Sequence, residues 1–99
     1  MKVRVVLNEQ QQLLSQQEEV LKKHFGEDLE LEQVRIPAQD LSCDQQADFA
    51  SRIVQQCAEG EAVVAASPFP VLLAKLAMLR TMKSFVFGVF VNSKKLWLV

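Results

Sequence analysis

The chain has 99 residues, of which 49% are hydrophobic and 23% are charged, and its net charge at pH 7 is −1. A chain of this length accommodates one compact domain, and the composition is typical of a globular protein near the apolar end of the usual range. The near-neutral charge disfavours binding to duplex nucleic acid or to an anionic membrane, whereas a short anionic ligand remains compatible with it.

The sequence predicts neither a membrane segment nor a secretion signal. Lys75, Arg80 and Lys83 interrupt the longest apolar stretches well before the roughly 20 residues that a membrane helix needs, and the N-terminal MKVRVV lacks a signal-peptide pattern. We therefore expect a cytoplasmic protein. If Cys43 and Cys57 share one helix, a rise of ~1.5 Å per residue separates them by about 21 Å, so we expect reduced, buried thiols rather than a disulfide.

Taken in chain order, the first predicted element is a buried strand over residues 3–7 (VRVVL) that ends at Asn8. The next segment allows two interpretations: a helix capped by Asn8, or a loop over residues 8–14 followed by a helix whose capping box is formed by Ser15 and Glu18. We favour the second interpretation, with Gly26 ending the helix. Residues at three- and four-residue spacing would form its inward face: Val20, Leu21, His24 and Phe25.

The middle of the chain predicts a strand, a helix and a further strand. Residues 28–36 alternate apolar and polar side chains with one irregular step, and Pro37 closes this strand. Ser42 and Gln45 form another capping box, after which apolar residues recur at helical spacing until Gly60. Residues 62–66 (AVVAA) are apolar on both faces, which is typical of a central strand in a parallel sheet.

The last third of the chain predicts one more helix and two strands. Proline is favoured at the first helical position, so Pro68 or Pro70 would open a helix that runs to about Met82. This helix is apolar on nearly every side and needs cover on two faces, which together with the apolar excess of a small domain favours a homodimer. Residues 84–91 predict a strand, residues 92–95 (NSKK) a turn, and residues 96–99 (LWLV) an antiparallel last strand.

This order of elements predicts an α/β fold: a single small Rossmann-like three-layer domain over residues 1–99. Its mostly parallel sheet would have the strand order 2-1-3-4, with an antiparallel C-terminal edge strand. In such sheets ligands bind at the carboxyl ends of the strands where the strand order reverses, which here lies between strands 1 and 3. That position selects the loop over residues 8–11 and the loop over residues 67–70.

Ser67 would lie where the N-terminus of a helix can meet an anion, with its hydroxyl beside the free N–H groups of the first turn. It could equally be a simple helix cap. Pro68 and Pro70 lack an N–H group, and no glycine-rich phosphate-binding motif occurs, so dinucleotide and ATP sites are disfavoured. His24 is the only histidine and has no cysteine at metal-ligand spacing, so we expect neither a metal nor a cofactor.

Four stretches together resemble the minimal stand-alone members of the CRISPR-associated Rossmann fold (CARF) group, the ring nucleases of antiviral defence. These are LLSQQEEVLKKHFG, VRIPAQDLS, EAVVAASPFPVLLAKLA and VFGVFVNSKK, which span most of the chain. The resemblance implies a homodimer that binds one cyclic oligoadenylate across its two-fold axis. It further implies metal-independent cleavage, in which a ribose 2′-hydroxyl attacks its own phosphodiester.

The resemblance also suggests roles for individual residues. Asn8 and Gln10 would contact the ribose or base, Ser67 and the Phe69 backbone would contact phosphate, and Lys94 or Lys95 would stabilise developing charge. The ligand-binding set is Asn8, Gln10, Gln11, Pro68, Phe69 and Asn92, and the catalytic set is Ser67, Lys94 and Lys95. Without the resemblance, Lys94 and Lys95 are also compatible with an ordinary polar hairpin turn.

An alternative function comes from a different class of protein. The edge strand over residues 96–99 and the apolar third helix would suit a non-catalytic dimerisation or regulatory module, with Trp97 as an interface anchor. A phosphotransfer domain of a sugar-uptake system is disfavoured because no cysteine or histidine follows the first strand.

Overall fold

The computed structural model describes residues 1–37, 40–66 and 69–99. Within these residues, five strands and three helices follow one another in the predicted order. They are β1 (Lys2–Asn8), α1 (Ser15–Phe25), β2 (Glu30–Ile36), α2 (Cys43–Gln56), β3 (Ala62–Ala65), α3 (Pro70–Leu79), β4 (Val86–Asn92) and β5 (Lys95–Leu98).

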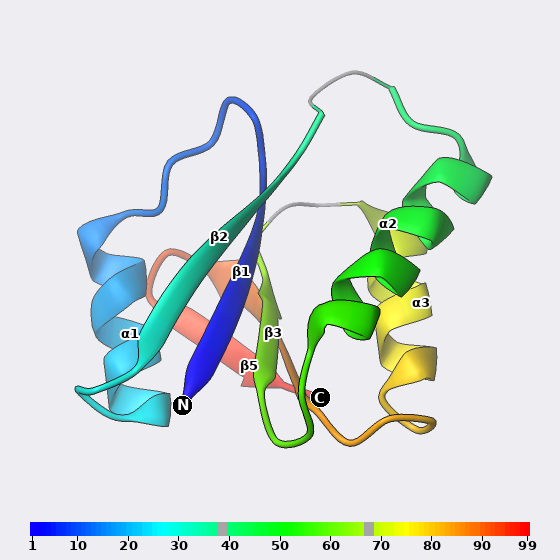
Figure 1. Ribbon diagram of the computed structural model, residues 1–99. Helices are drawn as coiled ribbons and strands as arrows, with labels where there is room; N and C mark the ends of the chain where they lie inside the picture. Colours follow the sequence, from blue (N-terminus) through cyan, green and yellow to red (C-terminus); the bar gives the residue numbers. More distant parts are fainter. Residues whose placement is uncertain (38–39, 67–68) are drawn as a thin grey trace.

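The strands form one sheet of order β2-β1-β3-β4-β5. β2, β1, β3 and β4 run parallel to one another, and β5 runs antiparallel to β4. This arrangement confirms the predicted Rossmann-like α/β topology. Figure 1 shows α1 on one side of the sheet and α2 and α3 together on the other, so the domain has three layers.

Successive side chains of each strand point to opposite faces of the sheet, so the core has two parts, one on each face. In β3, Ala62 and Val64 belong to the cluster beneath α1, and Val63 and Ala65 belong to the cluster beneath α2 and α3. All four residues are buried, which confirms β3 as a central strand. The two parts of the core fix β1 and β3 side by side, and so fix the edge at which their carboxyl ends meet.

The helix starts partly match the expected capping boxes. For α2 the prediction is confirmed, because Ser42 Oγ accepts from the Gln45 N–H at 3.1 Å and the Ser42 N–H donates to Gln45 Oε1 at 2.8 Å. For α1 the prediction is wrong by one residue. Leu14 occupies the N-cap position, its N–H donates to Gln17 Oε1 at 3.0 Å, and Ser15 is already helical. Gln17 therefore bonds to the N-cap residue, although the leucine side chain at that position cannot accept a hydrogen bond in return.

Burial corrects two further expectations. His24 is exposed rather than inward-facing, because α1 packs on the sheet through a narrow stripe in which only Leu21 is buried. Cys57 is buried as expected, but Cys43 is exposed, since it is the first residue of α2 and lies beyond the part of the helix that covers the core. Gly26 ends α1 as expected, with a positive φ of 105° that favours glycine, but its ψ of 155° lies outside the left-handed helical conformation that was predicted.

α3 ends at Leu79 and not near Met82. After the helix, the Thr81 hydroxyl and N–H both donate to the Met78 carbonyl, at 2.7 and 3.1 Å, and the Met82 N–H donates to the Leu79 carbonyl at 3.0 Å. These contacts close tight turns that carry the chain away from the helix axis. Met82 is 81% exposed as a result.

Candidate functional site

The carboxyl ends of β1 and β3 meet at the predicted reversal of strand order. Val6 pairs with Ala65 at the end of β3, whereas β1 continues to Asn8, which pairs only with Ile36 on β2. Asn8 therefore projects beyond β3 and begins the loop that borders the reversal point. This arrangement brings residues 8–11 and Ala66, the residue after β3, to the same edge, as the sequence predicted.

Asn8 and Gln11 shape the loop after β1. Asn8 Oδ1 accepts from the N–H groups of Gln10 and Gln11 at 2.8 and 2.9 Å, while Gln11 Oε1 accepts from the Asn8 N–H at 3.0 Å. Gln11 Nε2 then donates to the Ala66 carbonyl at 3.1 Å. A single side chain thus joins the loop after β1 to Ala66, the residue that follows β3.

Arg35 adds a positive charge to this edge that the sequence analysis did not select. Its Nη1 donates to the Asn8 carbonyl at 3.2 Å and also to the Gln11 carbonyl, and its Nη2 donates to Gln33 Oε1 at 2.6 Å. Arg35 is the next-to-last residue of β2, so its side chain leaves the sheet beside the loop after β1. Its place one residue before the carboxyl end of a parallel strand is the signal that could have identified it.

The N-terminus of α3 differs from the expectation. The first-turn N–H groups of Val71 and Leu72 are not free, because both donate to Gln46 Oε1, at 3.1 and 3.3 Å. Gln46 comes from α2, is buried, and donates through Nε2 to the Leu41 carbonyl at 3.2 Å. A neutral amide oxygen therefore occupies the position that was predicted for an anion. The sequence signal was a lone polar residue within the buried stripe of α2.

Of the site residues predicted after β3, Ser67 and Pro68 lie outside the described residues. Phe69 is the N-cap residue of α3, and its half-buried side chain packs against the core beneath α2 and α3. Its carbonyl accepts from the Leu73 N–H at 2.9 Å, as expected for the first helical turn.

Asn92 ends β4, Lys95 begins β5, and Lys94 lies with Ser93 in the two-residue turn between them. Asn92 Oδ1 accepts from the Lys94 N–H at 2.9 Å, and Lys95 Nζ lies 5.7 Å from the centre of the Trp97 ring. The turn lies against α1: Ser93 Oγ and Gln16 Oε1 are 3.1 Å apart, and Lys94 borders a hollow of about 300 Å³ that is otherwise lined by α1. Within the described part of the chain, no hydrogen bond or ion pair joins Lys94 or Lys95 to residues 8–11 or to Phe69.

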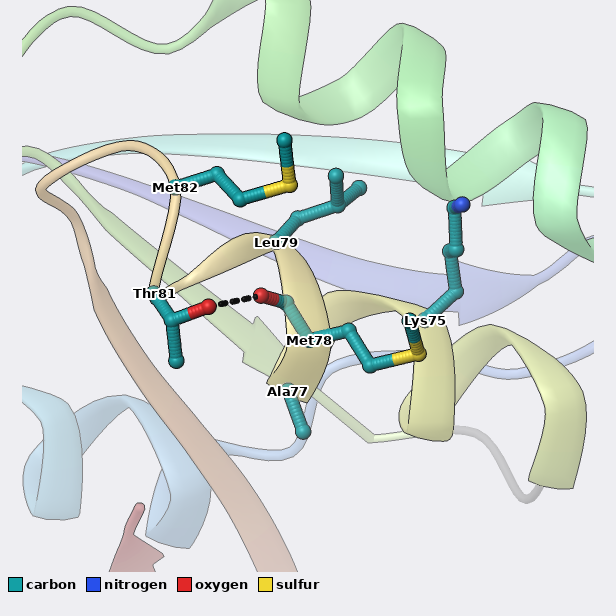
Figure 2. A pocket seen from close by; sticks show the side chains of 6 residues that line it. All are labelled: Lys75, Ala77, Met78, Leu79, Thr81 and Met82. Carbon is teal, nitrogen blue, oxygen red and sulfur yellow. Dashed lines mark hydrogen bonds between the residues drawn. The ribbon is translucent and has the colours of Figure 1, made fainter.

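A second hollow, of about 430 Å³, lies on α3 and the turn that follows it. Figure 2 shows its lining residues, with the Thr81 hydroxyl bonded to the Met78 carbonyl. Because α3 begins at the carboxyl edge of the sheet and its last turn carries this hollow, the hollow lies away from the reversal point.

The most buried charge lies near the amino ends of the strands. Arg4 Nη1 is 2.6 Å from Glu61 Oε1 and 3.5 Å from Cys57 Sγ, and Nη2 donates to the Gln56 carbonyl at 2.8 Å. The hydrogen bond from Arg4 lowers the pKa of the Glu61 carboxyl, and burial raises the pKa of the Cys57 thiol. This cluster ties the end of α2 to β1 and β3, so its geometry is that of a structural support.

Over residues 1–37, 40–66 and 69–99, no group of three or more histidine, cysteine, aspartate or glutamate side chains is placed to hold a metal ion. No helix in the same part of the chain has the length and apolar character needed to cross a membrane. Comparison with known proteins finds no matching family model, no significantly similar curated protein and no significantly similar solved structure.

Proposed function

We propose that this protein binds a cyclic oligoadenylate at the carboxyl edge of its sheet and cleaves it without a metal. Two copies would face each other across the ring, so that a symmetric ligand meets a symmetric site in the cytoplasm. The observation that carries the proposal is the hydrogen bond from Gln11 to the Ala66 carbonyl, which joins the loop after β1 to the residue after β3 at the reversal of strand order.

Charge and hydrogen bonding support the same ligand class. Arg35 lies beside the loop after β1, and a guanidinium suits the phosphate oxygens of a short nucleotide. Gln10 is exposed, and its N–H is held by Asn8, which fixes the backbone while leaving the glutamine side chain at the surface. These features suit recognition of an anionic ligand that also offers ribose and base groups.

In the proposed reaction the 2′-hydroxyl of one ribose loses its proton to solvent while its oxygen attacks the adjacent phosphorus, and the bond from phosphorus to the 5′-oxygen breaks. The 5′-oxygen leaves and takes up a proton, so the product is linear and ends in a 2′,3′-cyclic phosphate. Ser67 would hold the phosphate in line, and Lys94 or Lys95 would stabilise charge on its oxygens. For either lysine to do so, the turn between β4 and β5 has to approach the ligand from the α1 side.

The test mixes the purified protein with cyclic tri-, tetra- and hexa-adenylate in the absence of added metal. Binding at a hundredfold excess over Kd should stabilise the fold by roughly 2.7 kcal/mol, which a rise in melting temperature reports, and chromatography separates the products. Stabilisation together with linear products establishes the proposal, and stabilisation without products makes the protein a sensor. The absence of a shift with every ring refutes it.

Substitutions test whether binding and cleavage occur at the proposed site. Ser67→Ala and the pair Lys94→Ala and Lys95→Ala should slow cleavage, and Arg35→Gln should weaken binding. Arg52→Ala is the matched control, because Arg52 is exposed on α2 and pairs with Asp48 on the same helix.

One observation favours a second candidate function, a non-catalytic dimerisation or regulatory module. β5 is an edge strand on which Trp97 and Leu98 are 58% and 49% exposed. Exposed apolar side chains on an unpaired strand are typical of a surface that pairs with another chain. A protein of this kind would show no thermal shift with any nucleotide ring.

A further inference from the structure

The unpaired side of β5 has a defined hydrogen-bonding pattern. The Val99 N–H donates to the Phe87 carbonyl at 2.8 Å, so the pair of Val99 and Phe87 is a hydrogen-bonded pair of the antiparallel ladder. Such pairs alternate with non-hydrogen-bonded pairs, and the register continues through Leu98 with Gly88 and Trp97 with Val89. The N–H and C=O groups of Leu98, and by the same alternation those of Leu96, therefore point away from β4 toward the open edge.

The side chains of β5 leave apolar surface on both faces of the sheet. Trp97 pairs with Val89, which packs on the core beneath α2 and α3, whereas Leu96 belongs to the core beneath α1. Leu98, two residues from Leu96, shares the α1 face, as expected from the alternation of a strand. Beyond Lys95, the strand carries no charged side chain.

The opposite edge of the sheet is built differently. β2 has the sequence ELEQVRI, in which charged and polar side chains recur along the strand. Charged side chains on an edge strand oppose pairing with another chain, and β5 lacks that protection over most of its length. The contrast indicates that pairing is disfavoured at β2 and permitted at β5.

We infer that β5 pairs antiparallel with β5 of a second copy of this chain, about a two-fold axis that passes between the two Trp97 residues. In this register the outward N–H and C=O groups of Leu96 bond to those of Leu98 in the second copy, and the reverse, so every outward group of both leucines is satisfied. Trp97 meets Trp97 of the second copy as a non-hydrogen-bonded pair, for which the Cα atoms are ~4.5 Å apart and the side chains are in contact.

Charge favours the same register. With Trp97 at the centre, each Lys95 lies opposite Val99 of the second copy, and the two lysines are separated by about 14 Å, four residues at ~3.4 Å each. Shifting the axis to Lys95 would place the two cations directly opposite each other, which is destabilising. On the α1 face each exposed Leu98 lies beside Leu96 of the second copy, which is buried in the core of its own domain, so the pairing covers the exposed Leu98 on this face and Trp97 on the other.

This interface is separate from the one proposed for a shared ring. Because the strands of the two copies run in opposite directions, the two carboxyl edges point away from each other and both remain open. The inference therefore does not depend on any nucleotide. Pairing through β5 is tested in the ligand-free protein, and a negative result with the rings leaves it untouched.

The experiment measures sedimentation velocity of the full chain over a wide range of protein concentration, together with tryptophan fluorescence and circular dichroism. Trp97 is the only tryptophan, so a blue shift in emission and an exciton signal between two indoles report this interface alone. The expected result is a dimer that dissociates on dilution, with the tryptophan signals disappearing at the same concentrations.

Two variants and a control complete the test. Trp97→Lys places like charges across the axis and should give a monomer, and Met82→Lys makes the same kind of change at an exposed apolar residue beyond α3 and should leave the dimer intact. Leu98→Pro removes an outward N–H without removing a bond to β4 and should also give a monomer. A monomeric wild-type chain, a dimeric Trp97→Lys variant or an open-ended polymer would overturn the inference.

Discussion

Replacing Gln46 with leucine tests whether one side chain secures the N-terminus of α3. Gln46 Oε1 is the acceptor for the N–H groups of both Val71 and Leu72, and Leu72 is completely buried. Leucine has a similar volume but no acceptor, so the Leu72 N–H would be left unpaired in the core. The bond from Gln46 Nε2 to the Leu41 carbonyl would be lost at the same time.

The magnitude follows from how buried each group is. An unpaired buried donor costs about 1–3 kcal/mol, and the half-buried Val71 N–H and the Leu41 carbonyl lose less because water can replace part of their bonding. Together these losses should lower the free energy of unfolding by about 2–4 kcal/mol, a large share of the ~5–15 kcal/mol typical of a small domain. The melting temperature should fall by roughly 10–30 °C.

Urea unfolding followed by far-ultraviolet circular dichroism measures this loss. Gln55→Leu is the matched control, since Gln55 is exposed on the same helix, and it should change stability by less than about 0.5 kcal/mol. Gln46→Glu keeps an acceptor next to the positive end of the helix dipole and should cost less than Gln46→Leu. If Gln46→Leu is no more harmful than Gln55→Leu, the capping role is wrong.

Two further predictions concern the buried cluster around Arg4. Because the Glu61 pKa is lowered from its ordinary value of 4.5, the carboxylate contributes stability that is present above that value and is lost as pH falls through the lowered pKa. Glu61→Gln should therefore flatten the acid side of a plot of unfolding free energy against pH. An unchanged plot would contradict the pairing. The second prediction uses a thiol assay with a chromogenic disulfide, in which exposed Cys43 should react at once. Buried Cys57, whose pKa is raised by burial, should react only on unfolding. Equal rates would show that the end of α2 opens readily.

The topology could be predicted from the sequence because it depends on local signals. The short apolar strand AVVAA, the alternation in residues 28–36 and the capping box at Ser42 each specify one element, and their order leaves few arrangements of a parallel sheet. The loops at the reversal of strand order followed from that topology. The hydrogen bonds within these loops could not be predicted from the topology, because the Asn8 side chain could equally have pointed to solvent.

The contacts that could not be predicted from the sequence join residues far apart in the chain. Arg4 and Glu61 are 57 positions apart, and Gln46 reaches α3 across 25 and 26 positions. A polar residue in a buried stripe or strand signals that a partner exists, because an unpaired polar group in the core is costly. It does not identify the partner, which depends on helix packing that no local pattern encodes.

The way the carboxyl edge satisfies its own hydrogen bonds limits how it can attract an anion. Gln46 already occupies the first-turn N–H groups of Val71 and Leu72, and Asn8 holds the N–H groups of the loop after β1. Among the described residues of this edge, Arg35 offers a positive charge for the phosphates of the proposed ligand, and it is itself bonded to the Asn8 carbonyl. The proposed nucleotide ring would then gain its specificity from ribose and base contacts with this loop, and free phosphate would bind more weakly because it offers neither group.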